Sequence, residues 1–204
     1  MSDVDWESRY QNQDTPWDKG IAHPALDGLM GRFSDTKNAI VVPGCGRGWD
    51  LLALAKAFPA RELIGVDLSL SAVVAARELC IDFPHVQVHH ADFFDASSWA
   101  GDCQVGAIWE HTCFCAIPPE LRDAYAKTVS QILPTGGKLV GVFFTEMDDE
   151  NSGPPWNCGL ADLQVHFGSS FAMEIGDGSH RTFSSRQGEE RVIVMTRTGN
   201  QSFG

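Results

Sequence analysis

The chain has no run of about 18 uncharged apolar residues, the minimum for a membrane-spanning helix. Basic residues are also scarce: 15 Lys and Arg stand against 27 Asp and Glu, which gives a formal net charge of -12. A field of this sign repels phosphate backbones, and no local basic patch offsets it. The sequence therefore predicts neither a membrane protein nor a nucleic-acid-binding protein.

Targeting and linker segments are missing as well. The first ten residues, MSDVDWESRY, lack the basic and apolar regions of a signal or transit peptide, which predicts a cytoplasmic protein with reduced cysteines. No repeat, low-complexity tract or long linker interrupts the 204 residues. Because chains split into domains only beyond roughly 250–300 residues, residues 1–204 are predicted to form a single domain.

What the sequence does contain is an alternation of strand and helix patterns. The seven β-rich runs are Ala39–Val42, Leu63–Val66, Val86–His89, Val105–Trp109, Lys138–Phe144, Phe171–Ile175 and Arg191–Arg197. Helical spacing of apolar residues separates the first five, and only a short polar loop separates the last two. This pattern predicts an α/β fold: a doubly wound, seven-stranded, mostly parallel sheet that ends in an antiparallel hairpin.

A glycine loop follows the first of these runs. The sequence Pro43-Gly44-Cys45-Gly46-Arg47-Gly48 lies between a buried strand and the opening of a helix. Glycines let the backbone approach a ligand closely, and ligands of doubly wound sheets bind beyond the carboxyl ends of the strands. The third glycine of a dinucleotide fingerprint is replaced by Trp49, and no triphosphate-binding P-loop sequence occurs.

Two carboxylates stand at the ends of the next two strands. Asp67 can accept both hydroxyls of a ribose, and Asp92, followed by Phe93, can accept an adenine amino group while the ring stacks. Together with the glycine loop, these acids favour S-adenosyl-L-methionine over a nicotinamide dinucleotide. A nicotinamide-dependent oxidoreductase and a non-catalytic S-adenosylmethionine-binding protein remain the alternatives from other functional classes.

Further motifs run through nearly the whole chain in a fixed order. They are Trp6-Glu7-Ser8-Arg9-Tyr10, Thr15-Pro16-Trp17-Asp18-Lys19-Gly20, the glycine loop, Gly65-Val66-Asp67-Leu68-Ser69, Ala91-Asp92-Phe93-Phe94, Phe114-Cys115-Ala116-Ile117 and Gly153-Pro154-Pro155-Trp156. With these motifs the chain resembles the thiopurine S-methyltransferase family and the related plant and microbial thiol and halide methyltransferases. These are class I S-adenosylmethionine-dependent enzymes.

The resemblance implies a role for each matching position. Residues 1–35 would form a helical N-terminal lid, and Trp6, Tyr10 and Trp17 would fold over the cofactor. The implied cofactor-binding residues are Trp6, Tyr10, Trp17, Gly44, Cys45, Gly46, Asp67, Leu68, Asp92, Phe93 and Glu110. Glu110 and His111 align with an acid and an arginine or tyrosine near the sulfonium and the acceptor, so both are candidate catalytic residues. The resemblance also suggests a monomer.

Methyl transfer from a sulfonium is an in-line displacement that depends mainly on alignment. An acidic thiol or a halide ion arrives ionised, whereas a more basic thiol needs a proton acceptor, for which His111 is the best-placed group. We expect Phe114, Phe144 and Trp156 to bind a small apolar acceptor, with Phe143 and residues 151–156 completing its pocket. Selenium or tellurium species and natural-product thiols are the alternative acceptors.

A metal site is the remaining alternative. His111, Cys113 and Cys115 alternate along the chain, and Cys158 could add a fourth soft ligand for zinc. However, alternate side chains on one strand lie roughly 7 Å apart, and isolated cysteines usually behave as small buried hydrophobes. The sequence therefore predicts no metal.

Overall fold

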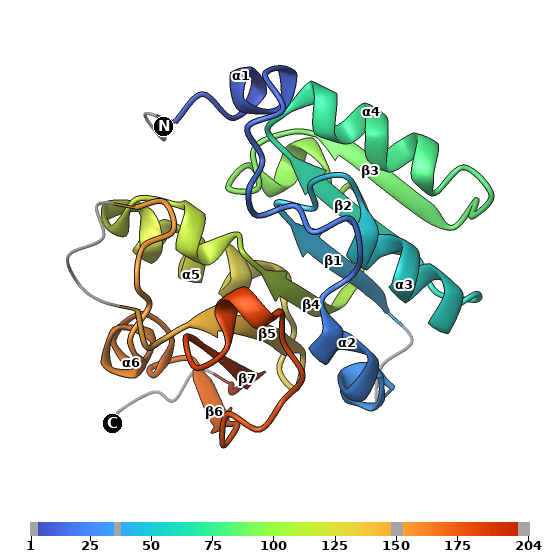
Figure 1. Cartoon of the computed structure of the whole chain (residues 1–204). Helices are drawn as coiled ribbons and strands as arrows, with labels where there is room; N and C mark the ends of the chain where they lie inside the picture. The colour runs from blue at the N-terminus through green and yellow to red at the C-terminus, as the bar shows by residue number, and fades with distance from the viewer. Residues whose placement is uncertain (1–3, 35–37, 148–152, 200–204) are drawn as a thin grey trace.

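A computed structural model describes residues 4–34, 38–147 and 153–199 (Figure 1). Its strands are β1 (Ala39–Pro43), β2 (Leu63–Asp67), β3 (Val86–His90), β4 (Val105–His111), β5 (Lys138–Phe144), β6 (Phe171–Ile175) and β7 (Glu190–Arg197). Its α-helices are α1 (Trp6–Gln11), α2 (Pro24–Leu29), α3 (Trp49–Ala57), α4 (Leu70–Leu79), α5 (Arg122–Ile132) and α6 (Leu160–Phe167). Each predicted β-rich run is a strand, whereas α6 has no counterpart among the predicted elements.

The seven strands form one sheet in the order β3-β2-β1-β4-β5-β7-β6. The first five strands pair in parallel, and β7 pairs antiparallel with both β5 and β6. The doubly wound α/β fold and the antiparallel terminal hairpin are confirmed. The hairpin does not extend the sheet in chain order, because β7 inserts between β5 and β6.

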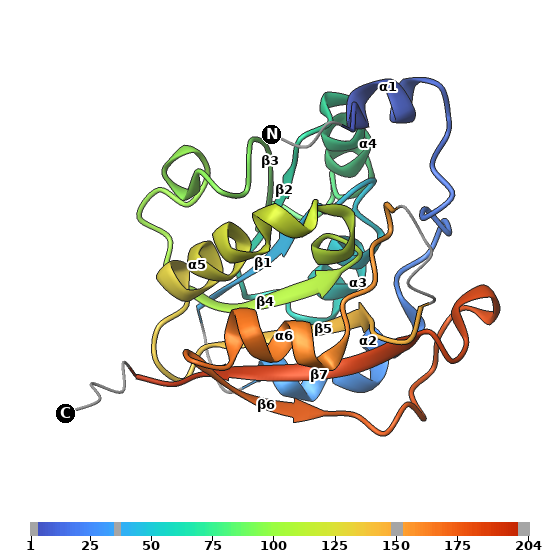
Figure 2. The ribbon, with the colours of Figure 1, turned by 90° about the vertical axis from the view of Figure 1, so that its left-hand side faces the viewer.

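Alternating apolar side chains divide the core between the two faces of the sheet. In β1, Ile40 and Val42 pack against α2, α3 and α4, while Val41 faces the opposite cluster with α5 and α6. Figure 2 shows α5 and α6 lying across one face of the sheet. Both faces are therefore covered, which explains why the strands read as continuous apolar runs.

The parallel strands β1 to β4 end at the same edge of the sheet, so the loops that follow them converge there. The N-cap of α4 contributes to this edge: the Ser69 hydroxyl accepts a hydrogen bond from the amide of Ala72 at 3.1 Å and starts the helix two residues after Asp67. Helix α1 packs on α4 beside this edge (Figure 1). None of the described helices is long and apolar enough to cross a membrane.

Candidate functional site

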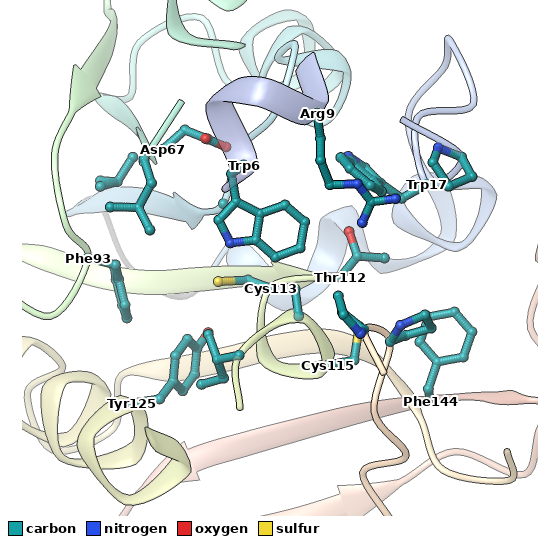
Figure 3. Close-up of a pocket in the computed structure, with 18 of the residues that line it drawn as sticks. Trp6, Arg9, Trp17, Asp67, Phe93, Thr112, Cys113, Cys115, Tyr125 and Phe144 are labelled. Carbon is teal, nitrogen blue, oxygen red and sulfur yellow. The ribbon is translucent and has the colours of Figure 1, made fainter. Parts of the chain in front are cut away.

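A cavity of about 340 Å³ opens at the carboxyl ends of the parallel strands (Figure 3). It is bordered by α1 and the segment after it, the ends of β2 and β3, and the segments that follow β4 and β5. The sequence-predicted site residues in its wall are Trp6, Tyr10, Trp17, Gly44, Asp67, Leu68, Asp92, Phe93 and Phe144. The other predicted residues, namely Cys45, Gly46, Glu110, His111, Phe114 and Trp156, lie outside this wall.

Asp67 anchors the glycine loop to the tip of β2. One carboxylate oxygen accepts a hydrogen bond from the amide of Gly46 and the other from the amide of Ser69, both at 2.9 Å. Burial raises the pKa of Asp67, and these two amides oppose the shift. A carboxylate has about four acceptor positions, so Asp67, which lines the cavity, keeps capacity for further donors.

The loop itself is close-packed at two glycines that both have positive φ. A Cβ on Gly44 (φ +56°) would lie 3.2 Å from the Sγ atom of Cys113, and one on Gly46 (φ +55°) would lie 3.0 Å from the hydroxyl of Tyr10. Only glycine adopts this conformation without strain while leaving the backbone open to a ligand. The loop is therefore shaped as a backbone cradle between the N-terminal segment and the end of β4.

The wall beyond β3 combines an acid with a supported aromatic ring. Asp92 lines the cavity and accepts a hydrogen bond from the amide of Phe94 at 2.9 Å. The ring of Phe93 stacks on Trp99 with centroids 5.6 Å apart and also contacts Tyr125. Its orientation is thus set by neighbours in the core, so this wall can receive a flat heterocycle beside a carboxylate.

The N-terminal segment covers the cavity with an aromatic cluster. Trp6 and Trp17 meet edge to face with centroids 5.4 Å apart, and the Trp17 indole donates to the hydroxyl of Tyr10 at 3.2 Å. The guanidinium of Arg9 lies 4.4 Å from the centroid of Trp17. In Figure 3, Trp6 projects from α1 into the cavity on the side opposite Tyr125. This cover is built from side chains that contact one another.

A carboxylate latch holds this cover to the rest of the molecule. Glu7 of α1 accepts hydrogen bonds from the hydroxyls of Ser69 and Ser71, at 2.6 and 2.7 Å, and from the amide of Ser71 at 3.0 Å. These serines open α4, where free amides and the helix dipole favour an anion. The hydrogen bonds lower the pKa of Glu7 to about 2.

The latch predicts a pH-dependent contribution to stability. The pKa of Glu7 falls from 4.5 to about 2 on folding, so its contribution is complete above pH 4.5 and declines as the pH drops toward 2. We expect the difference in unfolding free energy between the wild type and Glu7→Gln to be smaller at pH 4 than at pH 7. Urea denaturation measures it. Glu78→Gln, on the last turn of α4, is the control, and an unchanged Glu7 difference would contradict the latch.

Glu110 takes a different position from the one predicted. It is buried, accepts hydrogen bonds from the amides of Cys113 and Phe114 at 2.8 and 2.9 Å, and is also bonded by the hydroxyl of Tyr125. Burial raises its pKa, and these donors oppose the shift. With its oxygens occupied behind the wall, Glu110 shapes the turn after β4 and does not contact the cavity.

His111 is also displaced from its predicted place. Its Nδ1 atom lies 2.7 Å from a carboxylate oxygen of Asp50, and its Nε2 atom lies 3.0 Å from a guanidinium nitrogen of Arg186. Both ring nitrogens are therefore engaged, and no lone pair is free to take a proton from a ligand. His111, Cys45 and Gly46 line a smaller, neighbouring cavity of about 60 Å³.

Two of the three predicted acceptor-binding aromatics, and Phe143, which was predicted to complete their pocket, also lie outside the cavity wall. Of the predicted segment 151–156, residues 151 and 152 lie outside the described residues. Phe114 is fully buried and contacts Tyr125, Phe143 and Phe167. Trp156 turns its indole against Gly153, where an added Cβ would lie 2.3 Å from the ring, and Pro154 and Pro155 form the wall instead. Of this set only Phe144 lines the cavity. Phe114 packs inward because the strand ends at His111 and the next residues turn.

The burial of Phe114 predicts a structural effect. Phe114→Ala should lower the free energy of unfolding by about 3–5 kcal/mol, because it leaves a void among three aromatic rings. Phe94→Ala, at a half-buried position, should cost less. Urea denaturation of both variants checks the difference. Equal losses would show that Phe114 is not packed as described.

Sequence reasoning missed Arg186, which precedes β7. Its side chain is nearly buried and lines the cavity, with its guanidinium 5.2 Å from the ring of Phe144. The same guanidinium donates to the carboxylate of Glu190 at 3.1 Å and to the carbonyl of Trp17 at 3.2 Å. No sequence signal marked this residue, since an arginine in a polar loop is ordinarily exposed.

The zinc alternative depends on a strand that continues beyond His111, and β4 ends there. Thr112 has φ +65°, and Phe114–Ala116 form a short 3-10 helix, so His111, Cys113 and Cys115 do not share a strand face. All six cysteines lie in the described ranges and are free thiols. Within those ranges, no three His, Cys, Asp or Glu side chains are grouped to hold a metal ion.

Comparisons with known proteins identify the family that this chain matches and several of its relatives. The family model for thiopurine S-methyltransferase (TPMT) matches residues 1–198. The chain is 30% identical to thiocyanate methyltransferase 1 of Arabidopsis thaliana over 190 residues, which cover 92% of this chain and 82% of that protein. It is 26% identical to a thiopurine S-methyltransferase of Vibrio campbellii (strain ATCC BAA-1116), over 79% of this chain and 80% of that protein.

A solved structure shares the fold. Burkholderia thailandensis 1,6-didemethyltoxoflavin-N1-methyltransferase, with bound 1,6-didemethyltoxoflavin and S-adenosylhomocysteine, superposes with a TM-score of 0.72 at 15% identity. The match covers 96% of this chain and 86% of that one. At this identity the comparison supports the fold alone.

Proposed function

Because this chain belongs to the thiopurine S-methyltransferase family and is an S-adenosylmethionine-dependent S-methyltransferase of small thiols, we propose that its large cavity holds cofactor and acceptor side by side. In this arrangement the cofactor lies along the glycine loop, and the acceptor lies beside the contacting pair Phe144 and Arg186. The observation that carries the proposal is the single cavity that joins Asp67 and Gly44 at one end to these two residues at the other.

The residues present fit S-adenosyl-L-methionine. Asp67 retains acceptor capacity for the two ribose hydroxyls, and Asp92 beside Phe93 suits an adenine ring and its amino group. Gly44 presents backbone without a side chain to the cavity wall. Gly46 and Cys45 would support the cradle from behind, since they border the smaller cavity.

When bound, the cofactor supplies a methyl group on a positively charged sulfur. Trp6 and Trp17 present aromatic rings to the cavity, and a cation on such a face gains about 0.5–2 kcal/mol. We propose that the N-terminal segment predicted over residues 1–35 acts as the lid of a single domain predicted over residues 1–204; residues 1–3 and 35 lie outside the described residues. Closing this aromatic cover over the cavity excludes water and aligns the reacting atoms, which is the main requirement of an in-line displacement.

The acceptor end combines apolar surface with Arg186, and its sequence neighbours Ser185 and Glu189 also line the cavity. Phe144, Met147 and the prolines 154 and 155 supply the apolar surface, and Arg186 supplies a positive charge next to it. A guanidinium cannot accept a proton but attracts an anion, so Arg186 favours an acceptor that arrives as thiolate. With His111 occupied, the reaction proceeds without a dedicated base in this proposal. Small anions such as thiocyanate or a halide would satisfy the same end of the cavity.

Incubation with methyl-labelled S-adenosylmethionine and separate acceptors tests the proposal. The panel consists of an aromatic thiol, an alkyl thiol, a thiopurine, thiocyanate, iodide and selenite, with volatile products trapped. We expect transfer to sulfur acceptors, and faster transfer to those already ionised at the assay pH. Transfer to no sulfur acceptor would refute the assignment, and a thermal shift with NAD but not with S-adenosylhomocysteine would favour the oxidoreductase alternative.

We also propose that the enzyme is a cytoplasmic monomer. Analytical ultracentrifugation with and without S-adenosylhomocysteine checks the oligomeric state, and a single species at the monomer mass is expected. A dimer would contradict the proposed monomer.

A further inference from the structure

A buried polar cluster lies behind the acceptor end of the cavity. It brings together Asp50 from α3, His111 from the end of β4, His23 from the turn before α2, and Arg186 and Glu190 from the C-terminal part of the chain. Only Arg186 of these residues lines the large cavity. Four segments far apart in the sequence thus form one cluster, in which His111 and Glu190 contact the Arg186 guanidinium directly.

The hydrogen bonds determine which nitrogen of His111 carries the proton. A guanidinium has donors only, so the Arg186 nitrogen 3.0 Å from Nε2 donates to it and Nε2 accepts. Nδ1 then carries the hydrogen, which points to the Asp50 carboxylate 2.7 Å away. His111 is therefore a neutral ring that links a carboxylate to a guanidinium.

Asp50 is held as an anion in this chain of contacts. Burial would raise its pKa, but His111, the indole of Trp109 at 2.9 Å and the amide of His23 at 2.8 Å together lower it. All three donors point at the two carboxylate oxygens. The Asp50 carboxylate, which selects the Nδ1–H form of His111, is therefore both ionised and fixed in orientation.

Glu190 and His23 form a second pair of hydrogen-bonded groups, and Glu190 contacts Arg186. Glu190 accepts from Arg186 at 3.1 Å through one oxygen and faces His23 Nε2 at 3.1 Å through the other. Since His23 Nδ1 accepts from the amide of Ala25 at 3.2 Å, its hydrogen lies on Nε2, toward Glu190. Burial opposes ionisation of Glu190, but the bonds from His23 and Thr182 and the charge of Arg186 lower its pKa to about 2.

We propose that Asp50 and His111 are positioning residues whose function is to aim Arg186 at the methyl acceptor; this rests on the proposed function of the cavity. Asp50 selects the His111 tautomer, and His111 then accepts one hydrogen bond from the guanidinium. The second nitrogen of that guanidinium bonds the carbonyl of Trp17, so the same group ties the aromatic cover to the acceptor end. His111 acts as a hydrogen-bond acceptor and not as a base.

Substitutions of His111 that differ in their capacity to accept a hydrogen bond test the proposal. His111→Leu removes the hydrogen-bond acceptor of Arg186. It should raise the KM for the methyl acceptor about tenfold or more, with kcat changed less than threefold, because one charge-assisted bond is lost. His111→Gln should restore KM to within about threefold of the wild type, since its amide can donate to Asp50 and accept from Arg186. Asp50→Asn offers an amide donor toward Nδ1, which favours Nε2–H facing the guanidinium, and should resemble His111→Leu.

A spectroscopic readout separates positioning from simple stabilisation. In 15N-edited NMR spectra of the free enzyme at neutral pH, the His111 ring should be neutral with hydrogen on Nδ1 in the wild type. The Asp50→Asn substitution should move this hydrogen to Nε2. His166→Gln is the matched control: His166 also contacts two carboxylates but lies outside the cavity wall, so its KM should not change.

The outcomes distinguish this inference from the assignment of the cavity. If the wild type methylates thiols but His111→Gln and His111→Leu raise KM equally, or if the wild-type hydrogen lies on Nε2, the positioning role is wrong. If the wild type transfers no methyl group to any thiol, the proposed function fails first. The affinity of each variant for S-adenosylhomocysteine, expected within about twofold of the wild type, shows that the cofactor end is intact.

Discussion

Replacing Asp67 with alanine is expected to weaken S-adenosylhomocysteine binding by at least about 100-fold, which corresponds to roughly 3 kcal/mol. The proposed carboxylate bonds to the two ribose hydroxyls would be lost, and hydrogen bonds to charged groups contribute about 1.5–3 kcal/mol each. The amide of Gly46 would also lose its acceptor, which loosens the glycine loop. Isothermal titration calorimetry measures the change in Kd.

Two further variants make the Asp67 result specific. Asp67→Asn keeps one carbonyl oxygen and should bind with an intermediate affinity. Asp95→Ala removes an exposed acid that lies outside the cavity wall and should leave Kd unchanged. A loss below about fivefold for Asp67→Ala would place the ribose elsewhere and end the proposed orientation of the cofactor.

Replacing Arg186 with methionine is expected to lower kcat/KM for an ionised thiol by about 100-fold, mainly through KM. A charge-assisted contact in a site shielded from water contributes a few kcal/mol. The acceptor loses its negative charge as the methyl group is transferred, so the guanidinium stabilises the bound anion more than the transition state. Initial rates at several acceptor concentrations separate the two constants.

The control for Arg186 lies in the same loop. Arg181 is exposed and lies 3.9 Å from Asp27 at the surface, so Arg181→Met should retain wild-type kinetics. Because Arg186→Met also leaves buried Glu190 with one partner fewer, its unfolding must be measured in parallel. A folded Arg186→Met variant with unchanged KM for ionised acceptors would rule out the anion-attracting role.

Much of the cofactor end of the site could be predicted from the local sequence. The glycine loop follows a strand directly, and Asp67 and Asp92 stand at or just after the ends of the next two strands. Parallel strands of one sheet end at the same edge, so strand position alone predicts that these residues meet. The wall of the cavity contains Gly44, Asp67 and Asp92 as expected, although their contact with a cofactor remains a proposal.

The residues of the acceptor end could not be predicted from the local sequence. Phe114 and Trp156 are aromatic and close in sequence to cavity residues, yet the turn after β4 and the packing of the indole on Gly153 direct both away. His111 was assigned a base role because it aligns with a position near the acceptor and its imidazole can take a proton. Its actual partners, Asp50 and Arg186, are 61 and 75 residues distant along the chain. Side-chain direction at such turns depends on neighbours that are remote in sequence.

The sequence by itself determined the α/β class, the seven strands, the glycine loop and the acids at the strand ends. Each of these depends on periodicity or spacing over a few residues, and the backbone enforces such patterns locally. Only the tertiary structure decided that β7 lies between β5 and β6 and that Arg186 reaches the cavity. The contacts of His111 with Asp50 and Arg186 were decided there too, because burial brings together polar groups whose hydrogen bonds have to be satisfied within the protein.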